Sequence, residues 1–176
     1  SVKSRGLGDV YKRQYICNKI MKILEGKRGL IFGALDEKSI AWKVAQNAHE
    51  QGAKFVLSNA PIALRMGKIN ELAEKTGSRV IPADATSVDD LNKLFEESVK
   101  LLGGKLDFVL HSIGMSVNVR KGREYTDQNY DFTIKGFDVS ALSFHKVLQS
   151  AWKNESMNDY GSIVALSYIC LLYTSP

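Results

Sequence analysis

From Met21 onward, short apolar runs alternate with longer stretches in which apolar residues recur every three or four positions. The short runs are rich in β-branched residues and are bounded by Gly, Pro, Asp or Asn, a pattern that predicts strands. The predicted strands cover residues 29–32, 54–57, 79–81, 108–110 and 162–166. The helical periodicity predicts helices over residues 39–51, 63–76, 87–102 and 138–153.

The ends of these helices carry recognisable capping residues. Gly52 and Gly77 lie where C-terminal caps belong, and Ser87 and Asp138 lie where N-caps belong. Apolar strands that alternate with helices indicate a parallel sheet covered on both faces. We therefore expect an α/β fold, a doubly wound parallel sheet of the Rossmann-like type, in one domain. Five strands are fewer than such a domain usually has, so the fold is expected to be incomplete.

The two ends of the chain depart from this pattern. Residues 1–20 precede a plausible initiator, Met21, and their first part is similar to translated sequencing adapter, as is the terminal CLLYTSP. We expect a non-native or disordered leader over 1–20, the N-terminal part of an NAD(P)-binding Rossmann domain over 21–169, and a non-native tail over 170–176. The alternative is a natural extension at each end.

Composition and charge exclude several classes of function. The formal net charge is +5, but residues 1–20 hold five basic residues and one acidic residue, so the remainder is almost neutral, with 19 basic and 18 acidic residues. A nucleic-acid partner is therefore not expected. No apolar run is long enough to span a bilayer, and the start has no signal-peptide pattern, so we expect no membrane partner and a cytoplasmic location. We expect no metal site, because the histidines have no partners at ligand spacing. They are His49, His111 and His145.

Candidate binding chemistry follows the first predicted strand. Gly33 ends that strand, and a helix that begins at Ser39 would direct free N–H groups and the positive end of its dipole at the turn. This arrangement suits a pyrophosphate, which Ser39 and Ile40 would contact. The full Gly-x-Gly-x-x-Gly fingerprint is absent, so the alternative of a glycine turn without a ligand stays open.

Three more blocks follow later strands, at the edge of the sheet where ligands bind in open α/β folds. They are Asp84-Ala85, Ser112-Ile113-Gly114 and Ser167-Tyr168. The alternative for Asp84 is a helix or turn cap, and the alternative for Tyr168 is an aromatic residue that closes the core.

Together with Gly33 and Ser39-Ile40-Ala41, these blocks resemble the enoyl-acyl-carrier-protein reductases, a branch of the short-chain dehydrogenase/reductase superfamily. The resemblance runs from about residue 21 to 169. An ordinary short-chain dehydrogenase has Asn-Ala-Gly after the fourth strand, whereas this chain has Ser112-Ile113-Gly114. The resemblance implies reduction of trans-2-enoyl thioesters to saturated acyl thioesters, by hydride transfer from NADH, in fatty acid elongation.

The resemblance also implies roles for the candidate residues. Asp84 would accept from the adenine amino group, and the backbone at Ala85 would read the ring edge. Ser112, Ile113 and Gly114 would line the ribose and diphosphate of the cofactor. Tyr168 would be the outer active-site tyrosine, beside the substrate carbonyl. In the family, a second tyrosine and a lysine follow in the pattern Tyr-x-x-x-x-x-x-Lys, and the printed sequence does not contain them. The chain is therefore expected to be an inactive fragment.

Cofactor preference and partners are less well defined by the residues themselves. Ser58-Asn59-Ala60-Pro61 lies where an acidic residue would indicate NAD, with Arg65 a turn later, so the residues leave NADH and NADPH open while the resemblance favours NADH. The implied partners are acyl carrier protein carrying the enoyl substrate and further copies of the chain in a homotetramer. In the superfamily the helix predicted over 138–153 also builds the dimer interface.

The basic cluster and the function of the whole chain each allow another interpretation. The cluster Arg120-Lys121-Gly122-Arg123 suits an acidic carrier protein, but a solvated loop is the simpler interpretation. Other functions for the whole chain are a short-chain reductase acting on a carbonyl, and a nucleotide-binding module without catalysis.

Overall fold

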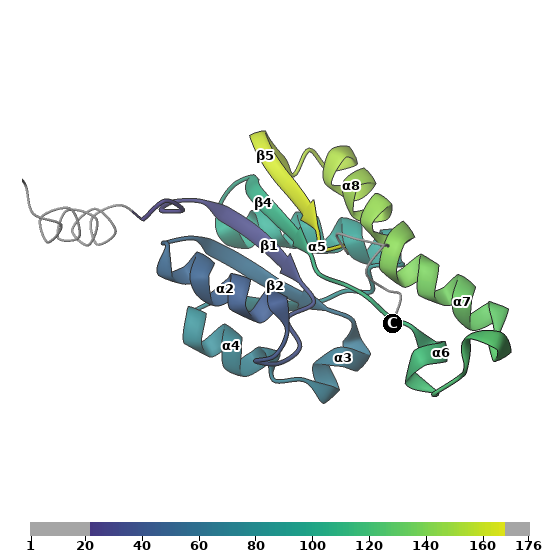
Figure 1. Ribbon diagram of the computed structural model, residues 1–176. Helices are drawn as coiled ribbons and strands as arrows, with labels where there is room; N and C mark the ends of the chain where they lie inside the picture. Colours follow the sequence, from purple (N-terminus) through teal and green to yellow (C-terminus); the bar gives the residue numbers. More distant parts are fainter. Residues whose placement is uncertain (1–21, 168–176) are drawn as a thin grey trace, which may run out of the picture.

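The computed structural model describes residues 22–167, which form a five-stranded sheet in the order β3-β2-β1-β4-β5 (Figure 1). Every neighbouring pair of strands is parallel. The strands are β1 Arg28–Phe32, β2 Lys54–Asn59, β3 Arg79–Pro82, β4 Leu106–His111 and β5 Met157–Ala165. This confirms the predicted α/β fold and all five predicted strands, with boundaries that differ by a few residues.

Helices cover both faces of the sheet. On one face lie α2 Ile40–Glu50 and α4 Ile69–Thr76, and on the other lie α5 Val88–Leu102 and α8 Ser143–Lys153. The remaining helical elements are α3 Pro61–Met66, α6 Val117–Arg120, the 3-10 turn η1 Tyr125–Asp127, α7 Tyr130–Phe137 and the π-helical turn η2 Asp138–Leu142.

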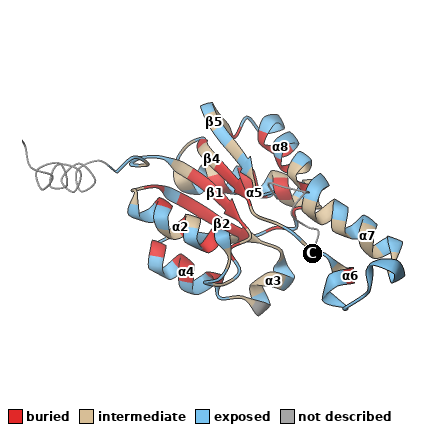
Figure 2. Cartoon of the chain, in the orientation of Figure 1, coloured by how far each residue is buried: buried red, intermediate tan, exposed pale blue. Residues whose placement is uncertain are grey.

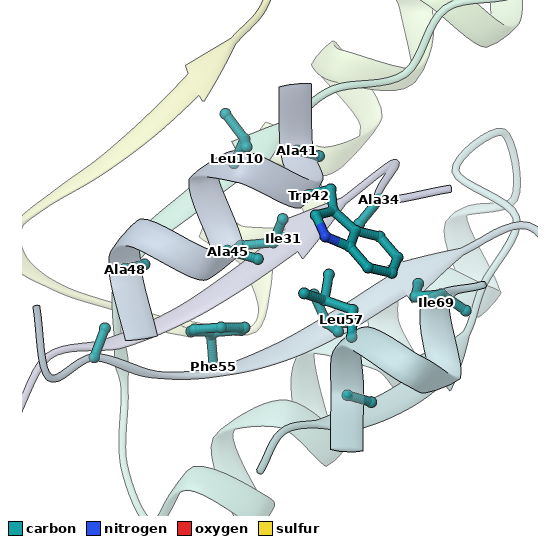
Figure 3. Close-up of a cluster of buried hydrophobic side chains, with 13 residues drawn as sticks. Ile31, Ala34, Ala41, Trp42, Ala45, Ala48, Phe55, Leu57, Ile69 and Leu110 are labelled. Carbon is teal, nitrogen blue, oxygen red and sulfur yellow. The ribbon is translucent and has the colours of Figure 1, made fainter. Parts of the chain in front are cut away.

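The core forms two layers because successive residues of a strand point to opposite faces. In β1, Ile31 faces α2 and α4, whereas Leu30 and Phe32 face α5 and α8. The centre of the first layer is the fully buried Trp42 of α2, which packs over the sheet beside Leu57 (Figure 3). In Figure 2 the buried residues concentrate in β1, β2 and β4, the three inner strands.

Two of the four predicted caps are found at the helix ends as expected. Ser87 is the N-cap of α5 and accepts a hydrogen bond from the N–H of Asp90, and Gly77 is the left-handed C-cap of α4. Gly52 lies one residue beyond the C-cap of α2, in a conformation with φ +90°. Its place there is close to the predicted one.

The predictions for two helices were wrong in part. The helix expected over 63–76 is divided at Gly67, whose backbone is extended and packs against the carbonyl of Leu35. Asp138 is not an N-cap, because its backbone is helical and it lies inside a run that continues from α7 through η2 into α8. Between β4 and α7 lie α6 and η1.

The predicted leader over 1–20 and tail over 170–176 lie outside the described residues. The same holds for Tyr168, the candidate outer tyrosine.

Candidate cofactor site

The order of the strands creates a switch point between β1 and β4. The chain moves from β1 outward to β2 and β3, and then returns to the opposite side of β1 to form β4. The connections after β1 and β4 therefore diverge at the carboxyl edge of the sheet, which opens the crevice where α/β proteins bind ligands. Gly33 follows β1 and Ser112 follows β4, so the two predicted glycine and serine blocks meet at this switch point.

Gly33 joins the ends of three strands. Its N–H donates to the carbonyl oxygen of Ser58 in β2, with an N···O distance of 3.1 Å. A Cβ at this position would collide with the carbonyl oxygen of Ser112, and the φ of +88° also disfavours any side chain. Glycine is therefore required by the neighbouring strand itself.

The loop between Gly33 and α2 is held by its own hydrogen bonds. The Ser39 hydroxyl donates to the carbonyl oxygen of Asp36 at 2.7 Å and accepts from the N–H of Leu35 at 3.3 Å. The N–H of Lys38 donates to a carboxylate oxygen of Asp36 at 2.9 Å. Ser39 has the extended backbone of an N-cap, but its hydroxyl bonds within the loop. Ile40 begins α2 and its side chain is exposed at this edge of the sheet.

The block after β4 is open on one side and anchored on the other. Gly114 is exposed, and among the described residues other than its two chain neighbours no atom lies within 4 Å of the position that its Cβ would take. The glycine is thus not required by packing within the described residues, which leaves room for the close approach of a ligand. Ser112 and Ile113 are partly buried. The next residue, Met115, is fixed by Ser140 of η2, whose hydroxyl oxygen accepts from the Met115 N–H at 2.9 Å.

His111 anchors the end of β4 in the core, a role that the sequence analysis missed. It is buried, and its Nε2 lies 2.8 Å from the Ser143 hydroxyl oxygen. That hydroxyl donates to the carbonyl oxygen of Val139 at 2.6 Å, so it accepts from the Nε2–H of His111. Burial lowers the pKa of His111 below its ordinary value, although a backbone hydrogen bond of the residue opposes the shift.

The block after β3 forms a capped turn. One carboxylate oxygen of Asp84, Oδ1, accepts from the Thr86 N–H at 2.9 Å and from the Thr86 hydroxyl at 2.7 Å. The turn-cap interpretation of Asp84 therefore describes this oxygen. Asp84 is exposed, and its second oxygen has no hydrogen-bond partner among residues 22–167. The side chain of Ala85 is buried in the core, so only its backbone can face a ligand.

The end of β2 carries neutral residues at the position where an acidic residue would indicate NAD. Ser58 is buried, and its hydroxyl has no partner within the described part of the chain. The side-chain oxygen of Asn59 accepts from the N–H of Ala60 at 3.0 Å. Arg65 is exposed in the last turn of α3.

In the basic cluster after β4, two of the three basic side chains contact other residues of the chain. Arg123 pairs with Asp127 at 2.9 Å, and the ammonium of Lys121 lies 4.6 Å from the centroid of the Phe132 ring. Arg120 is exposed. These contacts favour the solvated-loop interpretation for Lys121 and Arg123.

Residues 22–167 contain no group of three or more acidic, histidine or cysteine side chains that could hold a metal ion. Within the same range, no helix is both long and apolar enough to cross a membrane. Two hollows lie away from the switch point. One, of about 640 Å³, is lined by residues such as Lys54 and Arg79 at the amino ends of β2 and β3, and the other, of about 960 Å³, lies between β5 and α8.

Comparison with known proteins identifies the family of this site. The family model described as enoyl-(acyl carrier protein) reductase matches residues 33–176. The chain belongs to the enoyl-(acyl carrier protein) reductase family. It is 36% identical to the enoyl-[acyl-carrier-protein] reductase [NADH] FabI of Rickettsia bellii over 148 residues, 83% of this chain and 55% of that protein. It is 33% identical to enoyl-[acyl-carrier-protein] reductase [NADH] 1 of Rhizobium meliloti over 147 residues, 83% of this chain and 53% of that protein.

Solved structures of enoyl-(acyl carrier protein) reductases have the same fold. A FabI–NADH complex from Alistipes finegoldii superimposes with a TM-score of 0.82 at 59% identity, covering 84% of this chain and 52% of that one. The Bacillus cereus enoyl-acyl carrier protein reductase, solved with NADP+ and an indole naphthyridinone, superimposes with a TM-score of 0.74 at 30% identity, covering 85% of this chain and 58% of that one. The chain thus spans about half the length of the relatives that it matches. The family assignment made from the sequence motifs is confirmed.

Proposed function

We propose that this chain supplies the cofactor-binding half of an NADH-dependent enoyl-acyl-carrier-protein reductase of fatty acid elongation. The observation that carries the proposal is the convergence of Gly33 and Ser112 at the switch point between β1 and β4. Family membership supports the reaction, and relatives named for NADH support the cofactor. The substrate would be a trans-2-enoyl thioester on acyl carrier protein.

The geometry of the site fits a dinucleotide. At the start of α2 the N–H groups of Ile40 and Ala41 precede the first helical hydrogen bonds and lie beside the Gly33 loop, whereas the Trp42 N–H donates to the Ser39 carbonyl oxygen at 3.2 Å. The open space at Gly114 and the partly buried Ser112 and Ile113 suit the ribose and diphosphate. On the adenine side, the exposed second oxygen of Asp84 can accept from an amino group.

NADH would supply a hydride to the β-carbon of the enoyl thioester. The residues of this chain would bind and orient the cofactor through the Gly33 loop, through Ser39 and Ile40 at the start of α2, and through the block after β4. We assign Tyr168 the position beside the substrate carbonyl. The printed sequence contains no Tyr-x-x-x-x-x-x-Lys after Tyr168, so we propose that the 176-residue chain binds the cofactor without turnover.

The test is a titration of the 176-residue chain with NADH and with NADPH, followed by nucleotide fluorescence. We expect saturable binding that is tighter for NADH, and its loss in Gly33→Val, which fills the space at Ser112. The matched control is Gly122→Ala, which also changes a glycine of positive φ but has no atom within 4 Å of the added carbon. Absence of saturable NADH binding by the wild-type chain would exclude the proposal.

Activity is tested by joining the chain to the remaining carboxyl-terminal part of the 59% identical Alistipes finegoldii FabI. The chimera should oxidise NADH with a trans-2-enoyl thioester and do so slowly with a 3-ketoacyl thioester. The unjoined chain should show neither activity. Faster reduction of the keto thioester would assign the protein to the carbonyl-reducing branch of the superfamily.

We also propose a cytoplasmic location and assembly into a homotetramer in the complete protein. Support for assembly comes from an apolar stripe along α7, η2 and α8, which faces solvent and is defined by Tyr130, Ile134, Phe137, Leu142, Leu148 and Trp152. These side chains recur at intervals of three to six residues along one continuous helical run. Figure 2 shows this run coloured mostly as exposed or intermediate. A second copy of the chain is the proposed cover.

A further inference from the structure

The side chain of Lys146 in α8 contacts the turn that follows β3. Its ammonium donates to the carbonyl oxygen of Thr86 at 3.0 Å and to a carboxylate oxygen of Asp138 at 2.7 Å. The Lys146 side chain is only 26% exposed, and that of Asp138 37%. Charge-assisted bonds in such partly buried positions are stronger than surface ion pairs, so this contact is expected to be a stable one.

The carbonyl that Lys146 holds belongs to the turn that carries Asp84. Thr86 donates both its N–H and its hydroxyl to Oδ1 of Asp84, and the Ser87 N–H donates to the carbonyl oxygen of Asp84 at 2.9 Å. The turn from Asp84 to Ser87 is therefore one hydrogen-bonded unit. Lys146 links that unit to α8, 60 residues later in the sequence.

The same helical run also holds the end of β4. Ser140 bonds to the backbone of Met115, and Ser143 bonds to His111. In the sheet, β2 and β1 separate β3 from β4. One continuous helix thus fixes the turn after β3 and the loop after β4 relative to each other. These are the adenine-side and ribose-side blocks of the proposed cofactor site.

We propose that Lys146 is a positioning residue that, together with Asp138, holds the Asp84–Thr86 turn in place for the adenine end of the dinucleotide. This inference rests on the proposed function. Without the ammonium, the turn keeps its internal hydrogen bonds but loses its tether to α8. The turn is still anchored by the buried side chain of Ala85 but can shift more relative to the block after β4, and a ligand that contacts both must restore the geometry on binding.

The experiment measures binding of ADP and of NADH to the full 176-residue chain by calorimetry, in the wild type and in Lys146→Met, Lys146→Arg and Lys153→Met. Lys146→Met keeps the length of the stem and removes the charge. We expect it to weaken ADP and NADH by the same factor, about fivefold, the effect of one lost hydrogen bond. Lys146→Arg should restore most of the affinity. Lys153, exposed in the last turn of the same helix, is the matched control and should leave both affinities unchanged.

Hydrogen exchange on the ligand-free chains gives a second measurement. Lys146→Met should speed exchange of the amides from Ala85 to Ser87 and leave those of α2 unchanged. Equal ADP affinity in wild type and Lys146→Met would overturn the proposal. So would a loss that Lys146→Arg does not restore, or faster exchange throughout the molecule, since either indicates a general structural role. If the wild-type chain binds neither nucleotide, the proposed function is overturned together with the role of Lys146. If the wild type binds both and Lys146→Met binds them equally well, only the role of Lys146 is overturned.

Discussion

Phe32 and His111 pair across β1 and β4, and two residues at this junction, Gly33 and His111, meet opposite constraints. Gly33 must lack a side chain because the backbone at Ser112 occupies the space. His111 must keep a side chain that hydrogen-bonds, because its ring lies buried beside Ser143 and between Phe32 and Phe144. Single residues at the strand ends therefore determine how closely the two sides of the switch point approach.

Buried and neutral, His111 should make the stability of the fold depend on pH. Its pKa in the folded chain is below the ordinary value of 6.5, so the unfolded state binds the proton first as pH falls. The stabilisation is fully present above pH 6.5 and is lost progressively as pH falls from there towards the lower folded pKa. We expect the free energy of unfolding, from urea titrations, to fall between pH 7.5 and 5.5, and His111→Asn to remove most of that slope.

The control is His145→Asn, because His145 is exposed on α8 and should leave the slope unchanged. Asp107 does not interfere in this range. Burial raises the pKa of Asp107, but hydrogen bonds from Arg28, Lys27 and Asn158 outweigh it, so its pKa lies below 3.8 and its contribution is lost only at more acidic pH. An unchanged slope in His111→Asn would show that the ring accepts a proton in the folded state as readily as in the unfolded one.

At the scale of residues, the sequence identified the positions at the site better than their contacts. Gly33 was expected from its place at the end of the first predicted strand, in a loop suited to a pyrophosphate. Its collision partner, Ser112, lies 79 residues away, a pairing that only the sheet order reveals. His111 was taken as an isolated histidine, because its partner Ser143 lies 32 residues away and no local pattern pairs the two.

At the scale of elements, the division between α3 and α4 shows a tertiary contact that overrides helical periodicity. Residues 63–76 have the apolar spacing of one helix, and the structure ends α3 at Met66 and begins α4 at Ile69. Gly67 lies between them with its backbone against Leu35, and the Lys68 N–H donates to the Leu35 carbonyl oxygen at 2.8 Å. The break therefore serves to support the loop between β1 and α2.

Gly67→Ala should damage this support. A Cβ at Gly67 would lie 2.6 Å from the Leu35 carbonyl oxygen and 2.7 Å from its Cδ1 atom, closer than packed atoms allow. We expect a loss of about 1–3 kcal/mol in the free energy of unfolding, the usual cost of overpacking, and weaker NADH binding because the Gly33 loop shifts. Urea titration and nucleotide fluorescence measure the two effects.

Gly114→Ala is the control for stability, since an added methyl group there meets no atom within 4 Å. Its free energy of unfolding should stay within about 0.5 kcal/mol of the wild type. Equal free energies of unfolding for Gly67→Ala and the wild type would contradict the prediction, because the loop after β1 would then shift without any loss of stability.

The long helix shows a second limit of local patterns. Asp138 has the residue type of an N-cap, and the helix was predicted to start there, yet the chain is already helical from Tyr130. In α7 none of the residues is fully buried, so no apolar face against the core marks this segment as a helix in the sequence. Asp138 instead bonds to Lys146, a contact eight residues along the same run.

At the scale of the whole molecule, a parallel sheet covered on both faces followed from the alternation of strands and helices, whereas the strand order β3-β2-β1-β4-β5 was not predicted. The extent of the exposed apolar surface could not be predicted from the sequence. Val164 and Leu166 at the β5 side and the stripe on α7, η2 and α8 are exposed together on the described part of the chain. An apolar surface of this kind marks a site of association in soluble proteins.

The final prediction concerns the self-association of the 176-residue chain through this stripe. Trp152 is 85% exposed in the last turns of α8, and aromatic residues of this size dominate the free energy of interfaces. Trp152→Glu would bury a charge at the α8 end of the proposed contact, and this should shift the chain to monomer. Sedimentation velocity between roughly 1 and 100 µM should show concentration-dependent dimers or larger species for the wild type, within the range of weak to moderate interfaces, and mainly monomer for the variant.

The matched control is Ile62→Glu on α3, which adds the same charge at an exposed apolar residue outside the stripe and should associate like the wild type. A wild-type chain that stays monomeric over the whole range, or an Ile62→Glu variant that dissociates as fully as Trp152→Glu, would remove the stripe as the interface and leave the exposed edge of β5 as the surface to examine.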